Sequence, residues 1–394
     1  MTAAPSPDAP STTKIGDLAS AAGIHRVHVL AWRDLLDVEA GGSEIHADHV
    51  LSLWAEAGVE VTLRTSHAQG QPPEEMRNGY RVIRRAGRYL VFPRAAAAEA
   101  FGRTGPRDAL VEIWNGMPFF TPLWTGHPRL AILHHIHAEM WAMALPENLA
   151  RVGDFMERQA APMLYRRTPI ATLAESSRAE LIHDLGFHPD RVHVVPPGID
   201  PRYEPGGTRA AHPLLVAVGR LVPVKQYDRL LRAVAMARSS VPDLELVIVG
   251  EGLLKGELVH LIEDLDVGSF VSLIGRQSDE ALLNLYRSAW AVVSASAREG
   301  WGMTLTEAGA CGTPAIATRI AGHADAVIDG QSGLLVEPDD DRALADGIVR
   351  VMRDPAERER LSRGAREHAA TLTWTRTATD LMRILAADAR SRPR

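Results

Sequence analysis

Short runs of β-branched and other apolar residues alternate with longer segments of helical period, and this alternation constrains the fold more than any other feature. Strands separated by helices are typical of parallel βαβ architecture. In the helical segment 225–237, apolar side chains including Leu230, Leu231 and Val234 recur on one face. Strands are predicted at 27–32, 59–66, 80–85, 109–114, 130–135 and 169–176, then at 214–221, 244–252, 271–276, 290–296, 313–319 and 333–338. The pattern predicts an α/β protein with two parallel sheets in series.

Length and one Pro- and Gly-rich segment predict where the two sheets separate. A chain of 394 residues is longer than one ordinary core supports, and segment 193–207 is the candidate hinge. We expect an N-terminal Rossmann-like domain at 25–203 and a second at 204–374, with a helix at 375–394 that packs back on the first. Residues 1–24, which begin without the basic start and apolar stretch of a signal peptide, are predicted to be a disordered tail.

Charge and composition exclude several classes of protein. The formal net charge is −6, so no global positive field points to nucleic acid as a partner. No apolar run approaches the ~20 residues that span a bilayer. The single cysteine, Cys311, cannot form an intrachain disulfide and suits a reducing compartment. We therefore expect a cytoplasmic protein without a nucleic-acid partner.

Two carboxylates eight positions apart, Glu299 and Glu307, mark the most informative segment of the chain. Gly300 and Gly302 allow the backbone to approach a ligand closely. A helix beginning near Met303 would direct its free N–H groups and the positive end of its dipole toward an anion. Glu307 can accept hydrogen bonds from ribose hydroxyls beside that anion, and Glu299 from hydroxyls at the other end of the ligand. A nucleotide sugar has this arrangement of groups, and a capped surface helix with solvated glutamates is the alternative.

The spacing of Glu299 and Glu307 resembles the E-x7-E motif of the family-four retaining glycosyltransferases, which have the GT-B fold of two Rossmann-like domains facing each other across a deep cleft. Further blocks resemble successive blocks of that family, in order, at 40–63, 134–141, 195–200, 218–233, 274–296, 312–338 and 372–385. Ordered blocks are more specific than one motif. The resemblance implies metal-independent transfer of a hexosyl group from a nucleoside diphosphate sugar to a hydroxyl acceptor, with retained anomeric configuration.

The resemblance also assigns roles to residues. Arg220 and Lys225 are implied to hold the diphosphate, because fixed cations offset the charge that develops on the leaving group. On the N-terminal side, the Gly42 backbone is implied to contact the donor and His137 to lie against the donor sugar, while the Arg276 backbone lies beside the base. The implied catalytic set is His137, Arg220, Lys225 and Glu299, and the remaining donor-binding residues are Gly42, Arg276, Gly300, Trp301, Gly302, Met303, Thr304, Leu305 and Glu307.

Neither a metal nor another cofactor is predicted beside the nucleoside diphosphate sugar, which is a substrate. The histidines around position 135, together with Glu139, are the sequence's best candidate ligands for zinc. Their spacing fits no standard zinc framework, and Cys311 has no cysteine partner. We therefore expect a site without a metal ion.

Two other functions fit parts of the sequence. Segment 247–256 imitates a dinucleotide fingerprint and would suit an NAD-dependent oxidoreductase. Such a site requires an acid at the end of the next strand, and the sequence has Arg276 there instead. A non-catalytic nucleotide-sugar-binding protein is the third function. The residues that argue against it are Glu299, Glu307, Arg220 and Lys225.

Arginines crowd the stretch from Arg77 to Arg107, which holds Glu99 as its one acid. The aromatic residues Tyr89 and Phe101 interrupt it, and Phe92 lies between them. An anionic membrane or a lipid-phosphate acceptor would suit this composition and would place the protein at the inner face of the membrane. A solvated charged face is the alternative, and the sequence leaves both open.

Overall fold

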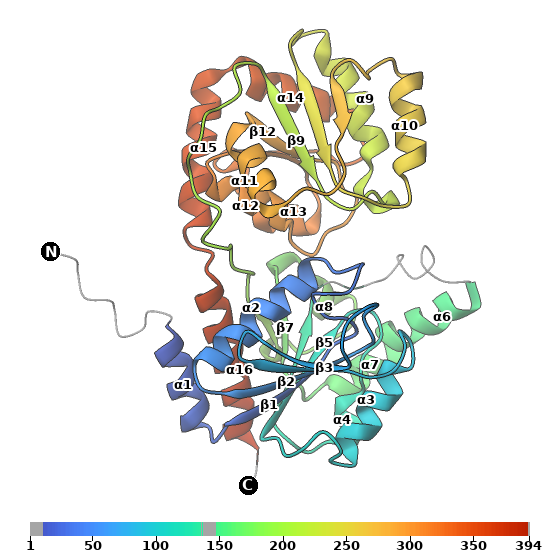
Figure 1. The fold of residues 1–394 in the computed structure, drawn as a ribbon, viewed down its shortest axis with the longest axis vertical. Coiled ribbons are helices and arrows are strands. Elements are labelled where there is room, and N and C mark those ends of the chain that lie inside the picture. The colour runs from blue at the N-terminus through green and yellow to red at the C-terminus, as the bar shows by residue number, and fades with distance from the viewer. Residues whose placement is uncertain (1–10, 135, 137–146, 393–394) are drawn as a thin grey trace, which may run out of the picture. The chain divides into compact units, whose positions relative to one another are not determined.

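The computed structural model describes residues 11–134, 136 and 147–392, and the chain separates into two compact units (Figure 1). Unit 1 comprises the residues through Gly198 together with those from Thr373 onward, and unit 2 comprises Ile199–Leu372. Each unit contains one open sheet with helices packed against it. The predicted α/β class with two sheets in series is confirmed.

The sheet of unit 1 has the strand order β3-β4-β2-β1-β5-β6-β7-β8 over the described residues. All neighbouring strands pair in parallel except β3, which pairs antiparallel with β4 at the edge. The sequence prediction missed β3 and β8. The strands are β1 Arg26–Leu30, β2 Glu60–Thr65, β3 Glu74–Arg77, β4 Tyr80–Arg84, β5 Ala109–Trp114, β6 Arg129–Leu133, β7 Ile170–Thr172 and β8 Val192–Val194.

Helices α1, α2 and α16 pack on one face of this sheet and form the main core of unit 1. Helix α16 buries Ala378, Leu381 and Leu385 there, at the three- and four-residue spacing of one helical face. The helices of unit 1 are α1 Thr12–Ala21, α2 Gly42–Glu56, α3 Val91–Ala100, α4 Thr121–Trp124, α6 Glu147–Phe155, the π-helical η1 Met156–Ala160, α7 Ala161–Tyr165, α8 Glu175–His183, the 3-10 turn η2 Pro189–Arg191 and α16 Trp374–Ser391.

The prediction of a disordered tail through residue 24 is wrong for Thr12–Ala21, which form α1. The Ser11 side chain accepts a hydrogen bond from the Lys14 backbone N–H and so caps the helix. Ile15 and Ala19, four positions apart, are buried in the same core as α16. The polar composition of the first residues obscured this short amphipathic face.

The sheet of unit 2 is parallel throughout and has the order β11-β10-β9-β12-β13-β14. Strands β10 and β11 are therefore added on one side of β9, and β12, β13 and β14 are then added on its other side. The strands are β9 Leu214–Val218, β10 Glu245–Val249, β11 Val271–Leu273, β12 Ala291–Ser294, β13 Ala315–Thr318 and β14 Gly333–Val336. The helices are the 3-10 turn η3 Pro223–Lys225, α9 Tyr227–Arg238, α10 Lys255–Asp264, α11 Asp279–Ser288, α12 Met303–Ala310, α13 Ala321–Ala326, α14 Asp341–Arg353 and α15 Pro355–Ala369.

The junction between β9 and β12 is the point where the strand order of unit 2 reverses. In open α/β sheets, ligands bind beyond the carboxyl ends of the strands at such a switch point. The segments that follow β9 and β12 carry Lys225 and Glu299 respectively. None of the described helices is long and apolar enough to cross a membrane.

Candidate functional site

The loop between β12 and α12 is shaped by glycines at positions where a side chain would not fit. Gly302 precedes α12 with φ 110°, a left-handed conformation that L side chains rarely adopt. Gly322, in the first turn of α13, packs against this loop, and a Cβ there would lie 2.4 Å from the Glu299 carbonyl oxygen and 2.7 Å from the Trp301 nitrogen. The helix begins at Met303, as predicted. The backbone from Glu299 to Gly302 is therefore fixed by contact on one side and by the helix on the other.

Glu299 forms an ion pair with Lys225 and accepts a second hydrogen bond from Ser296 Oγ at 2.9 Å. Burial favours the neutral carboxyl group, but the Lys225 ammonium, His323 and the two hydrogen bonds outweigh it, so the pKa of Glu299 is lowered. Both side chains of the pair keep about a fifth of their surface exposed, 21% for Lys225 and 18% for Glu299. The pair is thus charged, held in place and accessible to a ligand.

Lys225 lies in the 3-10 turn η3 and not, as predicted, at the opening of the next helix. Gln226 follows with φ 47° and turns the chain into α9. The Lys225 side chain lies against Gly219, where a Cβ would be 3.4 Å from Nζ. Gly250, with φ 148°, packs on Gly219 so closely that a Cβ would lie 1.9 Å from the Gly219 carbonyl oxygen. Gly219 thus leaves space for the Lys225 side chain at the end of β9, and Gly250 leaves space for the Gly219 backbone.

Glu307 faces Tyr286, whose hydroxyl donates a hydrogen bond of 3.1 Å to Oε2. Burial raises the pKa of Glu307 to about 7, and the nearby carboxylates of Asp200 and Asp279 add to the increase. Glu307 therefore exchanges its proton near neutral pH, unlike Glu299, which stays ionised. The two glutamates of the motif have opposite electrostatic environments.

His323 is a buried residue behind the loop that the sequence prediction missed. Its Nδ1 lies 3.0 Å from the Thr318 carbonyl oxygen, and its Nε2 lies 3.3 Å from Ser294 Oγ. Burial lowers the pKa of His323 even though Glu299 acts in the opposite direction. The ring also contacts the Gly302 position, where a Cβ would lie 3.2 Å from Cδ2. A Gly-His pair four residues beyond the end of β13 was the available sequence signal for this support.

Arg220 and Arg276 are both exposed, and neither side chain forms an ion pair or hydrogen bond with any residue the structure describes. Arg220 follows Gly219 directly and so lies beside the Lys225 turn in the chain. Arg276 follows Gly275, which has φ 71° and packs against the Glu251 carboxylate. The structure thus collects Lys225, Glu299 and the start of α12, while the roles predicted for the two arginines stay predictions.

The two predicted site residues outside unit 2 are Gly42 and His137. Gly42 is the first residue of α2, and the Glu44 carboxylate closes that helix end by accepting a 2.8 Å hydrogen bond from the Gly41 N–H. His137 and Glu139 lie outside the described residues. The predicted contacts of Gly42 and His137 with a donor therefore stay predictions. Within the described residues, no group of three or more His, Cys, Asp or Glu is placed to hold a metal ion.

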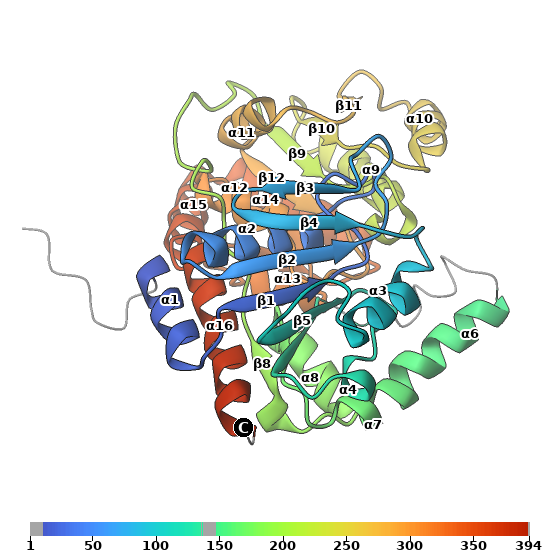
Figure 2. The ribbon, with the colours of Figure 1, turned by 60° about the horizontal axis from the view of Figure 1, so that its bottom comes forward.

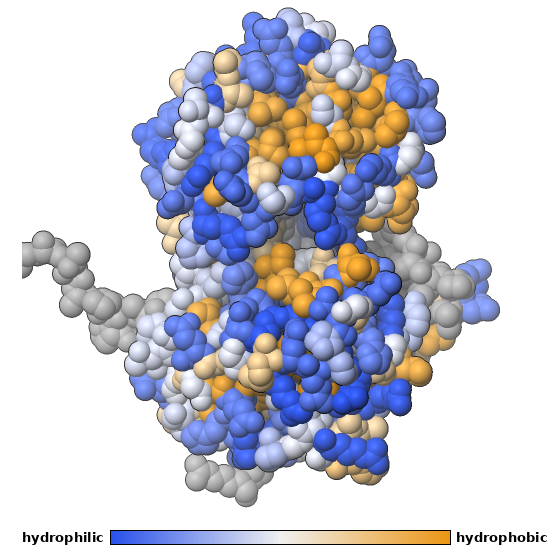
Figure 3. Space-filling model, in the orientation of Figure 1, coloured by the Kyte–Doolittle hydropathy of each residue, from blue (hydrophilic) through white to orange (hydrophobic). Residues whose placement is uncertain are grey.

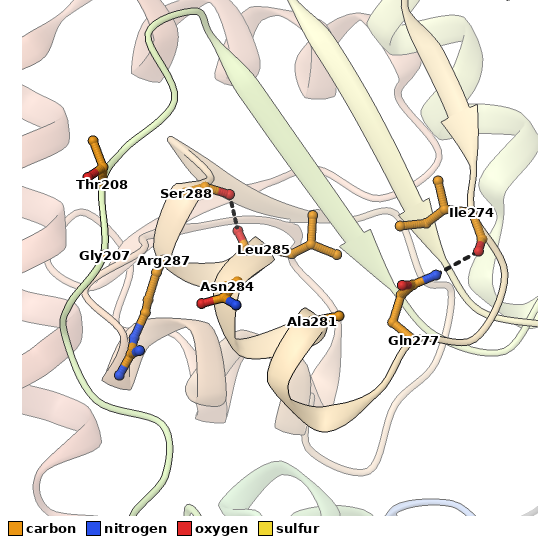
Figure 4. A pocket seen from close by; sticks show the side chains of 9 residues that line it. All are labelled: Gly207, Thr208, Ile274, Gln277, Ala281, Asn284, Leu285, Arg287 and Ser288. Carbon is orange, nitrogen blue, oxygen red and sulfur yellow. Dashed lines mark hydrogen bonds between the residues drawn. The ribbon is translucent and has the colours of Figure 1, made fainter.

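A separate hollow of about 520 Å³ lies beside α11 in unit 2, and none of the predicted site residues lines it (Figure 4). Leu285 and Ile274 face it from the helix and from the end of β11, and Arg287 points away toward Glu204. The space-filling view shows an apolar area on this visible face of unit 2 (Figure 3). Its polar lining includes Gln277 and Ser288, which donate hydrogen bonds to the backbone carbonyls of Ile274 and Leu285. The candidate site remains the one at the β9–β12 junction, where the predicted residues lie.

Comparison with known proteins identifies the family. Residues 204–368 match the family of group 1 glycosyl transferases, and residues 40–203 match glycosyltransferase family 4. A D-inositol 3-phosphate glycosyltransferase of Thermomonospora curvata is 30% identical over 399 residues, which cover 88% of this chain and 90% of that protein. The chain belongs to the family-four, group 1 glycosyltransferases. This confirms the family predicted from the Glu299–Glu307 motif, and it overturns the alternative of an NAD-dependent oxidoreductase.

Other relatives match this chain over a shorter length or at lower sequence identity. The D-inositol 3-phosphate glycosyltransferase of Stackebrandtia nassauensis is 36% identical over 227 residues, and the chain spans about half of it, 51%. Among solved structures, sucrose-phosphate synthase from Thermosynechococcus elongatus has a TM-score of 0.77 at 20% identity, covering 90% of this chain and 97% of that one. HepE from Anabaena in complex with UDP-glucose has a TM-score of 0.72 at 16% identity, covering 92% and 99%. The glycosyltransferase therefore has the predicted GT-B fold.

Proposed function

We propose that the protein transfers a hexosyl group from a nucleoside diphosphate sugar to a hydroxyl acceptor, with retained anomeric configuration and without a metal ion. Family membership supports the reaction class. HepE, which shares the fold, was solved with UDP-glucose, and the curated relatives carry the name D-inositol 3-phosphate glycosyltransferase. A uridine nucleotide and a phosphorylated polyol are accordingly the first donor and acceptor classes to test.

The observation that carries the proposal is the charged Lys225–Glu299 pair at the topological switch point of unit 2. An ammonium group there can bind a diphosphate oxygen, and the unpaired N–H groups at the start of α12 can bind another. Glu299 can accept hydrogen bonds from sugar hydroxyls, because its lowered pKa keeps it ionised. In the structure the carboxylate also fixes the ammonium in position, so a donor meets a cation that is already oriented.

The proposed chemistry requires no protein nucleophile. The bond between the anomeric carbon and the diphosphate oxygen breaks, and the acceptor oxygen bonds to the same face of that carbon. The acceptor proton passes to the leaving phosphate oxygen. Lys225 and the helix N-terminus then stabilise the negative charge on the departing diphosphate. Arg220 is assigned to the same diphosphate and Glu307 to the ribose hydroxyls.

The remaining parts of the proposal concern unit 1 and the cell. We assign acceptor binding to unit 1. We keep the donor contacts predicted above for Gly42 and His137 of unit 1, and the base contact predicted for the Arg276 backbone of unit 2. We also place the protein in the cytoplasm, supported by its one cysteine being a free, buried thiol. Peripheral association with the inner face of the membrane, through the stretch from Arg77 to Arg107, belongs to the same proposal.

The experiment measures release of nucleoside diphosphate when the full chain meets a donor and an acceptor. A panel of nucleoside diphosphate sugars is first screened for an increase in the unfolding temperature, because a ligand that binds the folded state stabilises it. The stabilising donors are then combined with myo-inositol phosphates and other hydroxyl acceptors. Release that depends on both substrates supports transfer. Donor binding without release on any acceptor would indicate a non-catalytic nucleotide-sugar-binding protein instead.

A further inference from the structure

A second hollow, of about 800 Å³, lies wholly within unit 1 and is lined by five arginines and one glutamate. Its walls come from β2, β4, the edge strand β3, and the end of α3 with the loop after it. The charged lining residues are Arg64, Arg81, Arg85, Arg94, Arg103 and Glu74. The lining thus carries four positive charges in excess.

The strand geometry explains why the arginines converge. Successive side chains of a strand point to opposite faces, so Arg81 and Arg85 share one face with Ile83 between them. Arg64 on β2 is in register with Ile83 on β4 and joins them on that face. Figure 2 shows β3, β4 and β2 unobscured toward the viewer, with α3 beside them. On this face, charged side chains and not a helix cover the end of the sheet formed by β3, β4 and β2.

The arginines of the stretch from Arg77 to Arg107 divide into two groups by their partners. Four of them are held by carboxylates outside the hollow: Arg77 and Arg84 by Asp34 and Glu75, Arg88 by Glu39, and Arg107 by Glu99. Within the hollow, Arg81 and Arg85 share Glu74, at 2.7 Å and 2.9 Å. Arg94 and Arg103 have no ion pair with any described residue, and Arg103 lies over the ring of Phe101 at 5.8 Å.

Arg64 forms the floor of the hollow and has an unsatisfied donor. Its Nη1 donates to Thr104 Oγ1 at 3.3 Å, but its buried Nε has no hydrogen-bond partner. Burial lowers the pKa of Arg64, and the charges of Arg85 and Arg94 lower it further, while the carboxylates of Glu99 and Glu74 act in the opposite direction. A buried N–H without an acceptor is costly, and like charges at close range repel. An anion in the hollow would relieve both.

We propose that this arginine hollow is a binding site for a phosphate-bearing group, separate from the donor site of unit 2. Guanidinium groups bind phosphate oxygens through paired N–H donors, and Arg94, Arg103 and the Arg64 Nε are available for such bonds. The phosphate can belong to a soluble molecule or to a lipid headgroup. The exposed side chains of Tyr89, Leu90 and Phe101, at 67%, 59% and 75%, are apolar anchors for the second source.

The first arm of the test titrates inorganic phosphate into the full chain by calorimetry at constant ionic strength. Lys225→Ala is introduced throughout, so that the proposed donor site does not contribute. Arg94→Gln with Arg103→Gln should then weaken phosphate binding about tenfold or more, the loss expected when charge-assisted hydrogen bonds are removed. The matched control is Arg353→Gln with Arg363→Gln, two exposed arginines of unit 2 without ion pairs to described residues. The control should leave phosphate affinity unchanged.

The second arm measures co-sedimentation of the same proteins with vesicles of phosphatidylcholine, with and without phosphatidylglycerol. Binding that needs phosphatidylglycerol and is lost with Arg94→Gln and Arg103→Gln supports the site and assigns the phosphate to a lipid. Phosphate binding with the same sensitivity, but without vesicle binding, supports the site and assigns a soluble ligand. The proposal is overturned when neither phosphate nor vesicles distinguish the hollow variant from its control. No donor is used, so this result is independent of the proposed transfer.

Discussion

The two units each gather cations at one place, and they treat those cations differently. In unit 2, Lys225 is held by Glu299, and its side chain packs against Gly219. In unit 1, Arg94 and Arg103 have no carboxylate partner among the described residues, and Arg64 keeps a buried N–H unsatisfied. A paired cation is oriented before its ligand arrives, whereas unpaired cations leave a positive field that a bound anion can neutralise. The first arrangement suits catalysis and the second suits binding.

The largest effect is expected when the oriented cation is removed. Lys225→Ala should lower transfer about tenfold to a hundredfold, since a charge-assisted hydrogen bond contributes roughly 1.5–3 kcal/mol. The measurement is nucleoside diphosphate release under saturating acceptor. The control is Lys255→Ala, which should retain activity. Lys255 is an exposed residue at the start of α10 and forms an ion pair with Glu251. Near-normal turnover in a folded Lys225→Ala protein contradicts the proposed role of the pair.

The next effect tests whether the glycine contacts orient the site. Gly322→Ala places a Cβ 2.4 Å from the Glu299 carbonyl oxygen, so the loop must shift. We expect a loss of about 1–3 kcal/mol in the free energy of unfolding of unit 2 and weaker donor binding, measured by urea unfolding and donor titration. At Gly256, within α10, a Cβ meets no atom within 4 Å. Gly256→Ala should therefore stabilise slightly, and equal effects of the two substitutions would refute the contact argument.

The third prediction uses the opposite pKa shifts of the two glutamates. Folded Glu307 has a pKa of about 7 against an ordinary value of 4.5, so the folded chain retains a proton that the unfolded chain has lost. Its contribution to stability therefore falls as pH rises from 4.5 to about 7, with a slope of at most about 1.4 kcal/mol per pH unit. Glu307→Gln should remove this dependence, as followed by urea unfolding across the window. Parallel stability curves for the two proteins would exclude the raised pKa.

The smallest effect is expected at the unpaired cations. Arg94→Gln should leave the free energy of unfolding unchanged or raise it by under about 1 kcal/mol, because it removes repulsion from Arg64 without removing an ion pair. Any gain should disappear at high salt, since screening weakens exposed charges. Thermal unfolding at low and high ionic strength measures it. Arg85→Gln, which removes a bond to Glu74, is the comparison and should not stabilise. A clear destabilisation by Arg94→Gln would show that its charge is already neutralised.

The sequence allowed much of the fold to be predicted, because parallel strands are buried on both faces and read as apolar runs. The exceptions have physical reasons. Glu74–Arg77 forms an edge strand in which three of the four residues are charged, and Val192–Val194 is too short for any periodic pattern. Helix α1 could have been predicted from the four-residue spacing of its apolar residues Ile15 and Ala19, but a prediction based on composition alone does not use this spacing.

The candidate site was predictable where its residues are close in the chain and not where they are distant. Glu299, Gly302 and the start of α12 follow from one segment. The pairing of Lys225 with Glu299 joins residues 74 positions apart and depends on β9 lying beside β12. In the same way, Arg64 joins the arginine-rich stretch only through the register of β2 with β4. Sequence spacing does not encode either contact.

Cys311 has a practical consequence for measuring these differences. It is the only cysteine in the chain, it is buried, and burial raises the pKa of its thiol to about 12. Almost none of it is thiolate at neutral pH, so alkylating dyes should react with it very slowly. A cysteine introduced at an exposed position would become the single labelling site. A fluorescent dye attached to such a cysteine in unit 1, or in unit 2, would therefore report on that unit alone.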